Sequence, residues 1–233
     1  MKTDNLNTIA RLAQKFRLEN GLSMSEAVNV KSLIRKLNIL AIYRPMSEYA
    51  YGLSLKSSKG CRFILINSNS SRGRQHFTIA HELYHLYYDE NPRPHICCKD
   101  GTSKTERSAD RFASALLMPE EGIIGMLTDA EYAEKKISIA QVLRLEQYFG
   151  VSRTTMLIRL KELNLISTAQ YETLKAYPVI RSAKEFGYDE SLYHSGNENL
   201  VIGDYGVKAR LLFENEKISE GHYLELLNLI QNE

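Results

Sequence analysis

The chain has 233 residues, enough for one sizeable core and a smaller second module, and its 43% hydrophobic and 25% charged residues are typical of a globular protein. A net charge of +2 lacks the basic bias that nucleic-acid-binding proteins usually show. The sequence contains no apolar run of signal-peptide length at its start and none that approaches the roughly 20 residues that cross a bilayer. We therefore expect a cytoplasmic protein that does not associate with a membrane.

The first part of the chain predicts two helices followed by three short strands. Residues 7–17 and 26–38 carry apolar side chains at helical spacing. A strand over 39–45 should end at its proline. The next two apolar runs, 51–55 and 62–67, are separated by a turn cluster, so we expect them to form a β-hairpin.

Helices dominate the remaining predicted elements. A helix should begin near Ser71 and run to Tyr87, a polar loop should cover 89–104, and a second helix should cover 104–118. Helical segments joined by a glycine turn are predicted within 137–167, and the chain should end with a helix near its C-terminus. This order of elements indicates an α+β fold.

The segment HELYH, residues 81–85, is a candidate metal site. Positions i and i+4 share one face of a helix, so His81 and His85 can bind the same ion. Glu82 is offset by one position and can reach a water molecule at that ion without binding it. Zinc suits two imidazole ligands. A chance match on an ordinary helix is the alternative, so the assignment depends on a third ligand.

Two patterns could supply the third ligand. The metzincin pattern requires a histidine six residues after His85, but Asn91 stands there. Glu106 on the next predicted helix is the other candidate, and Asp110 one turn later could accept a hydrogen bond from a ligand histidine. Ser103 and Glu106 also match a capping box, so a purely structural role is the alternative for Glu106. Beside the H-E-x-x-H motif, a ligand role is favoured.

The rival ligands near the motif are one histidine and a loop cluster. His76 lies five residues before His81, about 140° round the helix, and should point away from the metal. His95, Cys97 and Cys98 do not supply the four regularly spaced ligands of a structural zinc site. The three cysteines of the chain are too few and too irregular for a disulfide framework, and we expect reduced thiols that do not bind the metal.

With FTIAHELYH followed by TERSADRFASALLMP, the chain resembles the ImmA/IrrE family of intracellular zinc metallopeptidases. The resemblance implies a zincin-like peptidase domain, in which helices pack on a small mixed sheet. We place this domain at residues 1–130, a helical helix-turn-helix-like segment at 131–167 and a C-terminal extension of unknown role at 168–233.

The resemblance also implies the roles of the site residues. One zinc ion per chain would bind the two histidines of the motif and Glu106, and Glu82 would be the catalytic acid and base. Asp110 stands where the family usually has asparagine or aspartate. Tyr84 departs from the family, in which glycine is common at this position, but it removes no ligand.

The family resemblance further implies a regulatory function. Such enzymes cleave or otherwise inactivate a helix-turn-helix repressor, often encoded by a neighbouring gene on a mobile element or in a stress-response locus. We therefore expect a zinc endopeptidase with a repressor as its protein partner. The alternative is a metal-binding protein that sequesters a repressor without cutting it, although the retained Glu82 favours the enzyme.

The segment 137–167 resembles a helix-turn-helix, with its turn at Gly150. Residues 152–155, Ser-Arg-Thr-Thr, would begin the recognition helix. However, two net positive charges give little affinity for phosphates. We expect this segment to pack on the peptidase domain or to contact the repressor, and DNA binding is the alternative.

Two details of the catalytic site stay open in the sequence. The strand 62–67 precedes the metal helix and could be the edge strand that holds the substrate backbone, or simply a buried structural strand. The group that stabilises the oxyanion cannot be assigned, and the candidates are Tyr84, Tyr87, Tyr88 and His95.

Overall fold

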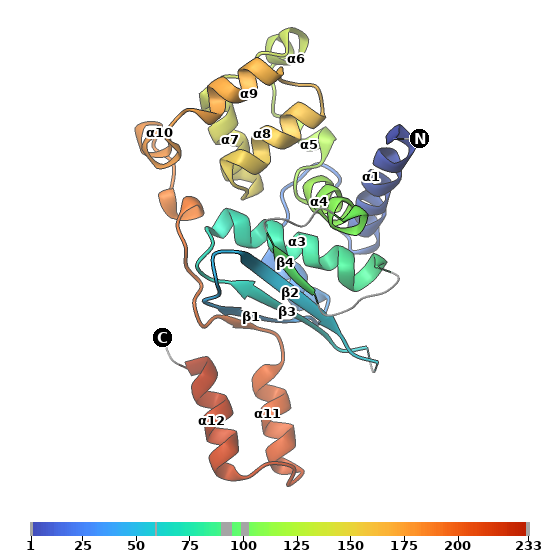
Figure 1. Cartoon of the computed structure of the whole chain (residues 1–233), viewed down its shortest axis with the longest axis vertical. Helices are drawn as coiled ribbons and strands as arrows, with labels where there is room; N and C mark the ends of the chain where they lie inside the picture. Colours follow the sequence, from blue (N-terminus) through green and yellow to red (C-terminus); the bar gives the residue numbers. More distant parts are fainter. Residues whose placement is uncertain (1, 59, 90–94, 99–102, 232–233) are drawn as a thin grey trace.

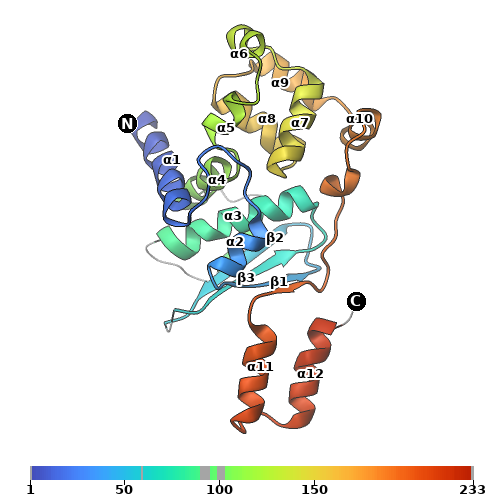
Figure 2. The same ribbon diagram turned by 180° about the vertical axis from the view of Figure 1, so that it is seen from behind.

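The structure, a computed structural model, describes residues 2–58, 60–89, 95–98 and 103–231. The described chain forms the predicted α+β fold, with a mixed sheet, helices packed on it, and a helical module beyond them (Figure 1). A helical hairpin at the C-terminal end projects from the opposite side of the sheet (Figure 2). In the part of the chain that the structure describes, no helix combines the length and the apolar character needed to span a membrane.

The sheet has five strands in the order β4-β2-β3-β1-β5. Strands β2 and β3 form the predicted antiparallel hairpin, β1 runs parallel to β3, and the two outer strands are antiparallel to their neighbours. The strand bounds are β1 Leu40–Arg44, β2 Ala50–Lys56, β3 Arg62–Asn67, β4 His95–Cys98 and β5 Val201–Ile202.

Strand β4 corrects two sequence predictions. It lies within 89–104, where a polar loop was predicted, and it forms the edge of the sheet beside β2. The idea that strand 62–67 is the edge strand was wrong, because β3 is paired on both sides. The signal for β4 is weak in the sequence because a short run after two prolines becomes a strand only by pairing with a distant partner.

The helices that build the first domain are α1 Lys2–Glu19, α2 Val30–Lys36, α3 Arg72–Tyr88 and α4 Lys104–Leu117. Helix α3 lies across one face of the sheet, with α4 and α1 packed on its outer side (Figures 1 and 2). Phe16 of α1 and Phe112 of α4 meet edge to face with ring centroids 5.6 Å apart, and both are fully buried. This aromatic contact fixes α4 against α1 and beside α3.

The helical module follows α4 and consists of α5 Glu120–Ile124, α6 Asp129–Glu134, α7 Ile139–Phe149, α8 Arg153–Glu162, α9 Thr168–Lys175 and α10 Val179–Glu185. The turn between α7 and α8 rests on the first turns of α3. A Cβ atom on Gly73 would lie 2.8 Å from the backbone nitrogen of Ser152, and the His76 ring donates a hydrogen bond to the Gly150 carbonyl at 2.8 Å. The predicted packing of this segment on the peptidase domain is therefore observed, and His76 faces the turn rather than the metal motif.

The start of α8 is poorly suited to DNA recognition. Arg153 is buried and its guanidinium donates hydrogen bonds of 2.7 and 2.8 Å to the carboxylate of Glu146. Thr155 is buried as well. Two of the four side chains that would face base edges are thus committed to the interior of the module, which weakens the DNA-binding alternative.

The last part of the chain adds one strand to the sheet and then forms two helices beyond it. A short 3-10 helix, η1 Glu190–Tyr193, leads to β5, and the helices α11 Tyr205–Glu214 and α12 Glu220–Gln231 form the projecting hairpin (Figure 1). Phe213 and Tyr223 stack with ring centroids 4.9 Å apart and join the two helices. Helix α12 agrees with the helix predicted near the C-terminus.

Candidate metal centre

Helix α3 carries the H-E-x-x-H motif on its buried side. The helix begins at Arg72, within one residue of the predicted start, and Ser71 caps it by accepting a hydrogen bond from the Arg74 backbone nitrogen. The apolar side chains Ile79 and Leu83 anchor the helix in the core with no exposed surface. Packing of this kind fixes the rotation of α3 and therefore the direction in which the motif points.

Three side chains converge from α3 and α4. The Nε2 atoms of His81 and His85 lie 3.2 Å apart. The carboxylate oxygens of Glu106 lie 3.2 Å from Nε2 of His81 and 3.4 Å from Nε2 of His85. Both imidazoles are buried, and the Glu106 side chain is largely covered. The three residues that the sequence singled out as ligands therefore form one compact cluster.

Glu106 has two roles in the described structure. The Ser103 hydroxyl accepts a hydrogen bond from the Glu106 backbone nitrogen at 3.1 Å, which caps α4. The Glu106 carboxylate lies instead against the two histidines. The capping and ligand interpretations are thus compatible, because they use different atoms of the same residue.

An outer carboxylate holds each histidine. The Nδ1 atom of His81 lies 2.9 Å from Asp110, as the sequence predicted, and the Nδ1 atom of His85 lies 3.1 Å from Asp89. Each carboxylate accepts a hydrogen bond from the Nδ1–H group of its histidine, which leaves the Nε2 lone pair directed toward the cluster. The sequence interpretation missed Asp89, although its position four residues after His85 was a usable signal.

The cluster fits a tetrahedral divalent metal. Two imidazole nitrogens on one such ion, each about 2.05 Å from it, lie about 3.3 Å apart. The two Nε2 atoms lie 3.2 Å apart, and one Glu106 oxygen lies 3.2 Å from His81 and the other 3.4 Å from His85, close to this value. Two neutral imidazoles and one carboxylate are also a donor set that binds such ions. His81, His85 and Glu106 could therefore hold a metal without rearrangement.

The electrostatic surroundings favour a positive charge at this point. Burial by itself lowers the pKa of His81, but hydrogen bonds to Asp110, Cys97 and Glu106 outweigh burial and raise that pKa well above its ordinary value. The same acceptors that stabilise a proton on the imidazole would stabilise a cation beside it.

Glu82 is fully buried next to the cluster, one position along α3 from His81. It is not one of the three converging donors, and one of its carboxylate oxygens lies within 4.8 Å of a ring nitrogen of His81. This placement lets Glu82 reach a water molecule at the cluster without itself being needed as a ligand.

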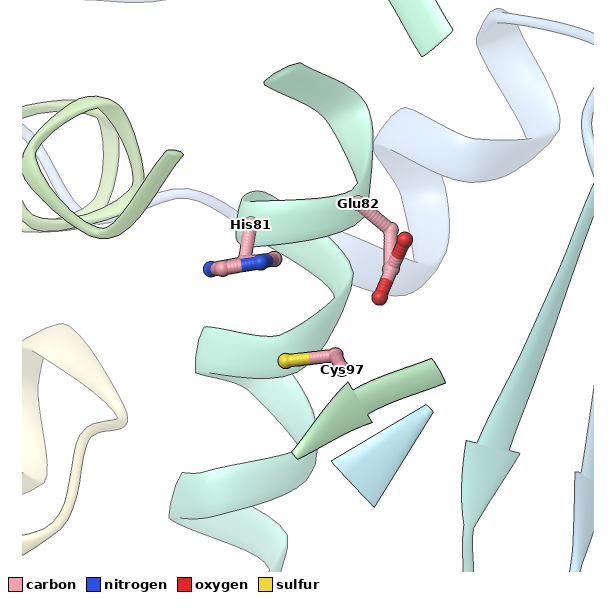
Figure 3. A group of neighbouring side chains, drawn as sticks. All are labelled: His81, Glu82 and Cys97. Atoms are coloured by element: carbon pink, nitrogen blue, oxygen red, sulfur yellow. The ribbon is translucent and has the colours of Figure 1, made fainter. Parts of the chain in front are cut away.

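Cys97 lies closer to the motif than the sequence indicated. Its Sγ atom, a ring nitrogen of His81 and a carboxylate oxygen of Glu82 all lie within 4.8 Å of one another. Figure 3 shows the thiol of Cys97 turned from β4 toward α3. The structure thus places Cys97 beside the site, and the expectation that it does not bind the metal stays a prediction. The side chains of His95 and Cys98 lie outside the described residues.

The tyrosine candidates differ in their surroundings. The rings of Tyr87 and Tyr88 pack against Phe16 of α1, with centroids 5.4 and 6.4 Å away. The Tyr84 ring packs on Phe112 with centroids 5.8 Å apart, and it also lies 5.8 Å from the ring of His85. Tyr84 is thus the candidate in direct contact with the cluster, although the group that would stabilise an oxyanion stays a prediction.

Removing Asp110 tests the outer support of the site. We expect Asp110→Ala to weaken metal binding by about 10- to 100-fold, because the His81 ring loses the group that orients it. Titration with a metal-binding dye measures this change. Glu162→Gln is the control, since Glu162 lines the same pocket as Asp110 but pairs with Arg159. Equal affinity in Asp110→Ala and wild type would contradict this role.

A helix with H-E-x-x-H, a glutamate from a second helix and a mixed sheet beneath them define a peptidase-type metal centre. The family model of the IrrE N-terminal-like domain, Peptidase_M78, matches residues 34–161, more than half of the chain. The chain therefore belongs to the ImmA/IrrE family of metallopeptidases, as its resemblance implied. A search of curated proteins gave no match.

Proposed function

We propose that the chain is a zinc endopeptidase that cleaves a cytoplasmic regulatory protein, specifically a helix-turn-helix repressor. The observation that carries this proposal is the convergence of His81, His85 and Glu106 beside the buried Glu82. Zinc is the metal we assign, because a small tetrahedral set of two imidazoles and one carboxylate suits it. The repressor comes from the family resemblance.

The chemistry follows from the positions of the side chains. Bound zinc would polarise the scissile carbonyl and lower the pKa of a water molecule at the site. Glu82 would take the proton from this water and deliver it to the leaving amine. Asp110 and Asp89 would hold the histidine rings in place while charge develops.

Edge strand β4 offers a place for the substrate backbone. It pairs with β2 on one side, and no strand within the described ranges pairs with its other side. An extended peptide could add there as a further strand, with its scissile bond beside Cys97 and Glu82. This role replaces the one considered for β3.

A pocket beside the centre could take a substrate side chain. Its volume is about 310 Å³, and it lies between α3, α4 and α8 with Asp110 in its wall. Arg74, Arg107 and Arg111 line it together with Phe77. A side chain that is apolar near the backbone and acidic at its end would suit this lining.

Incubation with a repressor tests the proposal. The zinc-loaded protein is mixed with the purified repressor encoded beside its gene, and the fragments are weighed by mass spectrometry. We expect one or a few discrete cleavage sites, loss of cleavage after chelation, and recovery when zinc is restored. A repressor that binds the zinc-loaded protein but stays intact would support the non-cleaving alternative instead.

A further inference from the structure

We propose that the Cys97 thiolate is a fourth ligand of the zinc ion in the resting protein and keeps the peptidase latent until it is displaced. This inference rests on the proposed function, because it concerns the same ion. It adds a residue from the edge strand to a ligand set otherwise drawn from α3 and α4.

The position of the thiol is the first support for this inference. Cys97 is only 7% exposed, and its Sγ atom belongs to a compact donor group with His81 and Glu82. A thiolate and an imidazole nitrogen on one tetrahedral zinc lie about 3.6 Å apart. The Sγ atom lies within 4.8 Å of a ring nitrogen of His81 but outside the cluster formed by His81, His85 and Glu106, so the thiol has to turn toward these donors when the ion binds.

The sheet itself brings Cys97 to α3. Cys97 pairs with Gly52 on β2, next to a register irregularity between Ala50 and Gly52. A Cβ atom on Gly52 would lie 2.7 Å from the Cγ2 atom of Thr78 on α3. The absence of a side chain at this position lets α3 approach the sheet, so that the neighbouring strand can present its thiol to the helix (Figure 3).

The consequence for catalysis follows from coordination number. Catalytic zinc sites keep one position open, whereas sites with four protein ligands are closed. The Cys97 Sγ atom lies beside the Glu82 carboxylate, where the attacking water has to lie to give up its proton. A thiolate at this point excludes that water, and its own proton passes to solvent when the metal binds.

Substrate binding at edge strand β4 could displace the Cys97 thiolate from the zinc ion. A substrate that pairs with the outer side of β4 adds to the strand that carries Cys97. Substrate binding would thus end latency. Without substrate on β4, the zinc would keep its thiolate ligand and the enzyme would not hydrolyse other proteins.

Cobalt substitution tests the ligand directly. Wild type, Cys97→Ser and Cys61→Ser are each loaded with one equivalent of Co²⁺, and near-ultraviolet absorption is recorded. Cys61 is an exposed cysteine in the β2–β3 turn and serves as the matched control. We expect a thiolate-to-cobalt band in wild type and Cys61→Ser, and loss of this band in Cys97→Ser with one cobalt still bound. Cys97→Ser should also cleave substrate faster than wild type.

The outcomes separate this inference from the proposed function. Stoichiometric cobalt without a thiolate band in wild type, or an unchanged band in Cys97→Ser, overturns the Cys97 ligand and leaves the peptidase proposal intact. A band without faster cleavage by Cys97→Ser overturns latency. Absence of stoichiometric cobalt in wild type overturns both proposals.

X-ray absorption at the zinc edge provides a test that does not depend on a folded variant. The zinc-loaded wild-type protein should show one sulfur neighbour at about 2.3 Å in addition to nitrogen and oxygen neighbours near 2.0–2.1 Å. A spectrum fitted by nitrogen and oxygen alone overturns the inference.

Discussion

Glu82→Gln should abolish peptide hydrolysis and leave metal binding unchanged. Glutamine has nearly the same volume, so it fits the fully buried position of Glu82. It cannot accept the proton of the attacking water, and loss of a general base typically costs about 10²- to 10⁴-fold in rate. The expected loss is measured as the initial rate of repressor cleavage at saturating zinc.

Two controls make the result of Glu82→Gln specific. Zinc content and melting temperature should match wild type, because none of the three converging donors is altered. Glu172→Gln makes the same chemical change at an exposed position of α9 in the helical module and should keep the wild-type rate. If Glu82→Gln cleaved as fast as wild type, Glu82 would not be the proton carrier and the proposed chemistry would have to be abandoned.

The parts of the site that the sequence predicted are those encoded by local signals. The i, i+4 spacing of His81 and His85 and the helix start near Ser71 are both signals within one helix, and both agree with the structure. The pairing of Glu106 with these histidines joins two helices, yet the motif spacing and the family resemblance were sufficient to indicate it.

The parts that the sequence did not predict depend on contacts between distant segments. Strand β4 exists because it pairs with β2, and Cys97 reaches the metal cluster only through this pairing. The central position of β3 likewise follows from its parallel partner β1. No periodicity within 89–104 or 62–67 carries this information, because partner choice in a sheet is set by the whole fold.

Glu106→Ala should remove most of the bound metal without unfolding the protein. It leaves two imidazoles at the centre, and even the loss of an outer hydrogen-bonding carboxylate costs about 10- to 100-fold in affinity, so we expect a loss of more than about 100-fold. The cap of α4 should survive, because Ser103 bonds to the backbone nitrogen of Glu106 rather than to its carboxylate.

Elemental analysis of protein purified without added metal measures the effect of Glu106→Ala. Wild type should carry one zinc per chain, and the variant should carry almost none and melt at the same temperature as metal-free wild type. Glu120→Ala, which removes an exposed carboxylate from the first turn of α5, should keep its zinc and shows that general loss of charge is not the cause. Equal zinc in Glu106→Ala and wild type would mean that α4 does not supply the third ligand. The ion would then be held by donors on α3 and β4 alone, with Cys97 as a primary ligand rather than a displaceable one.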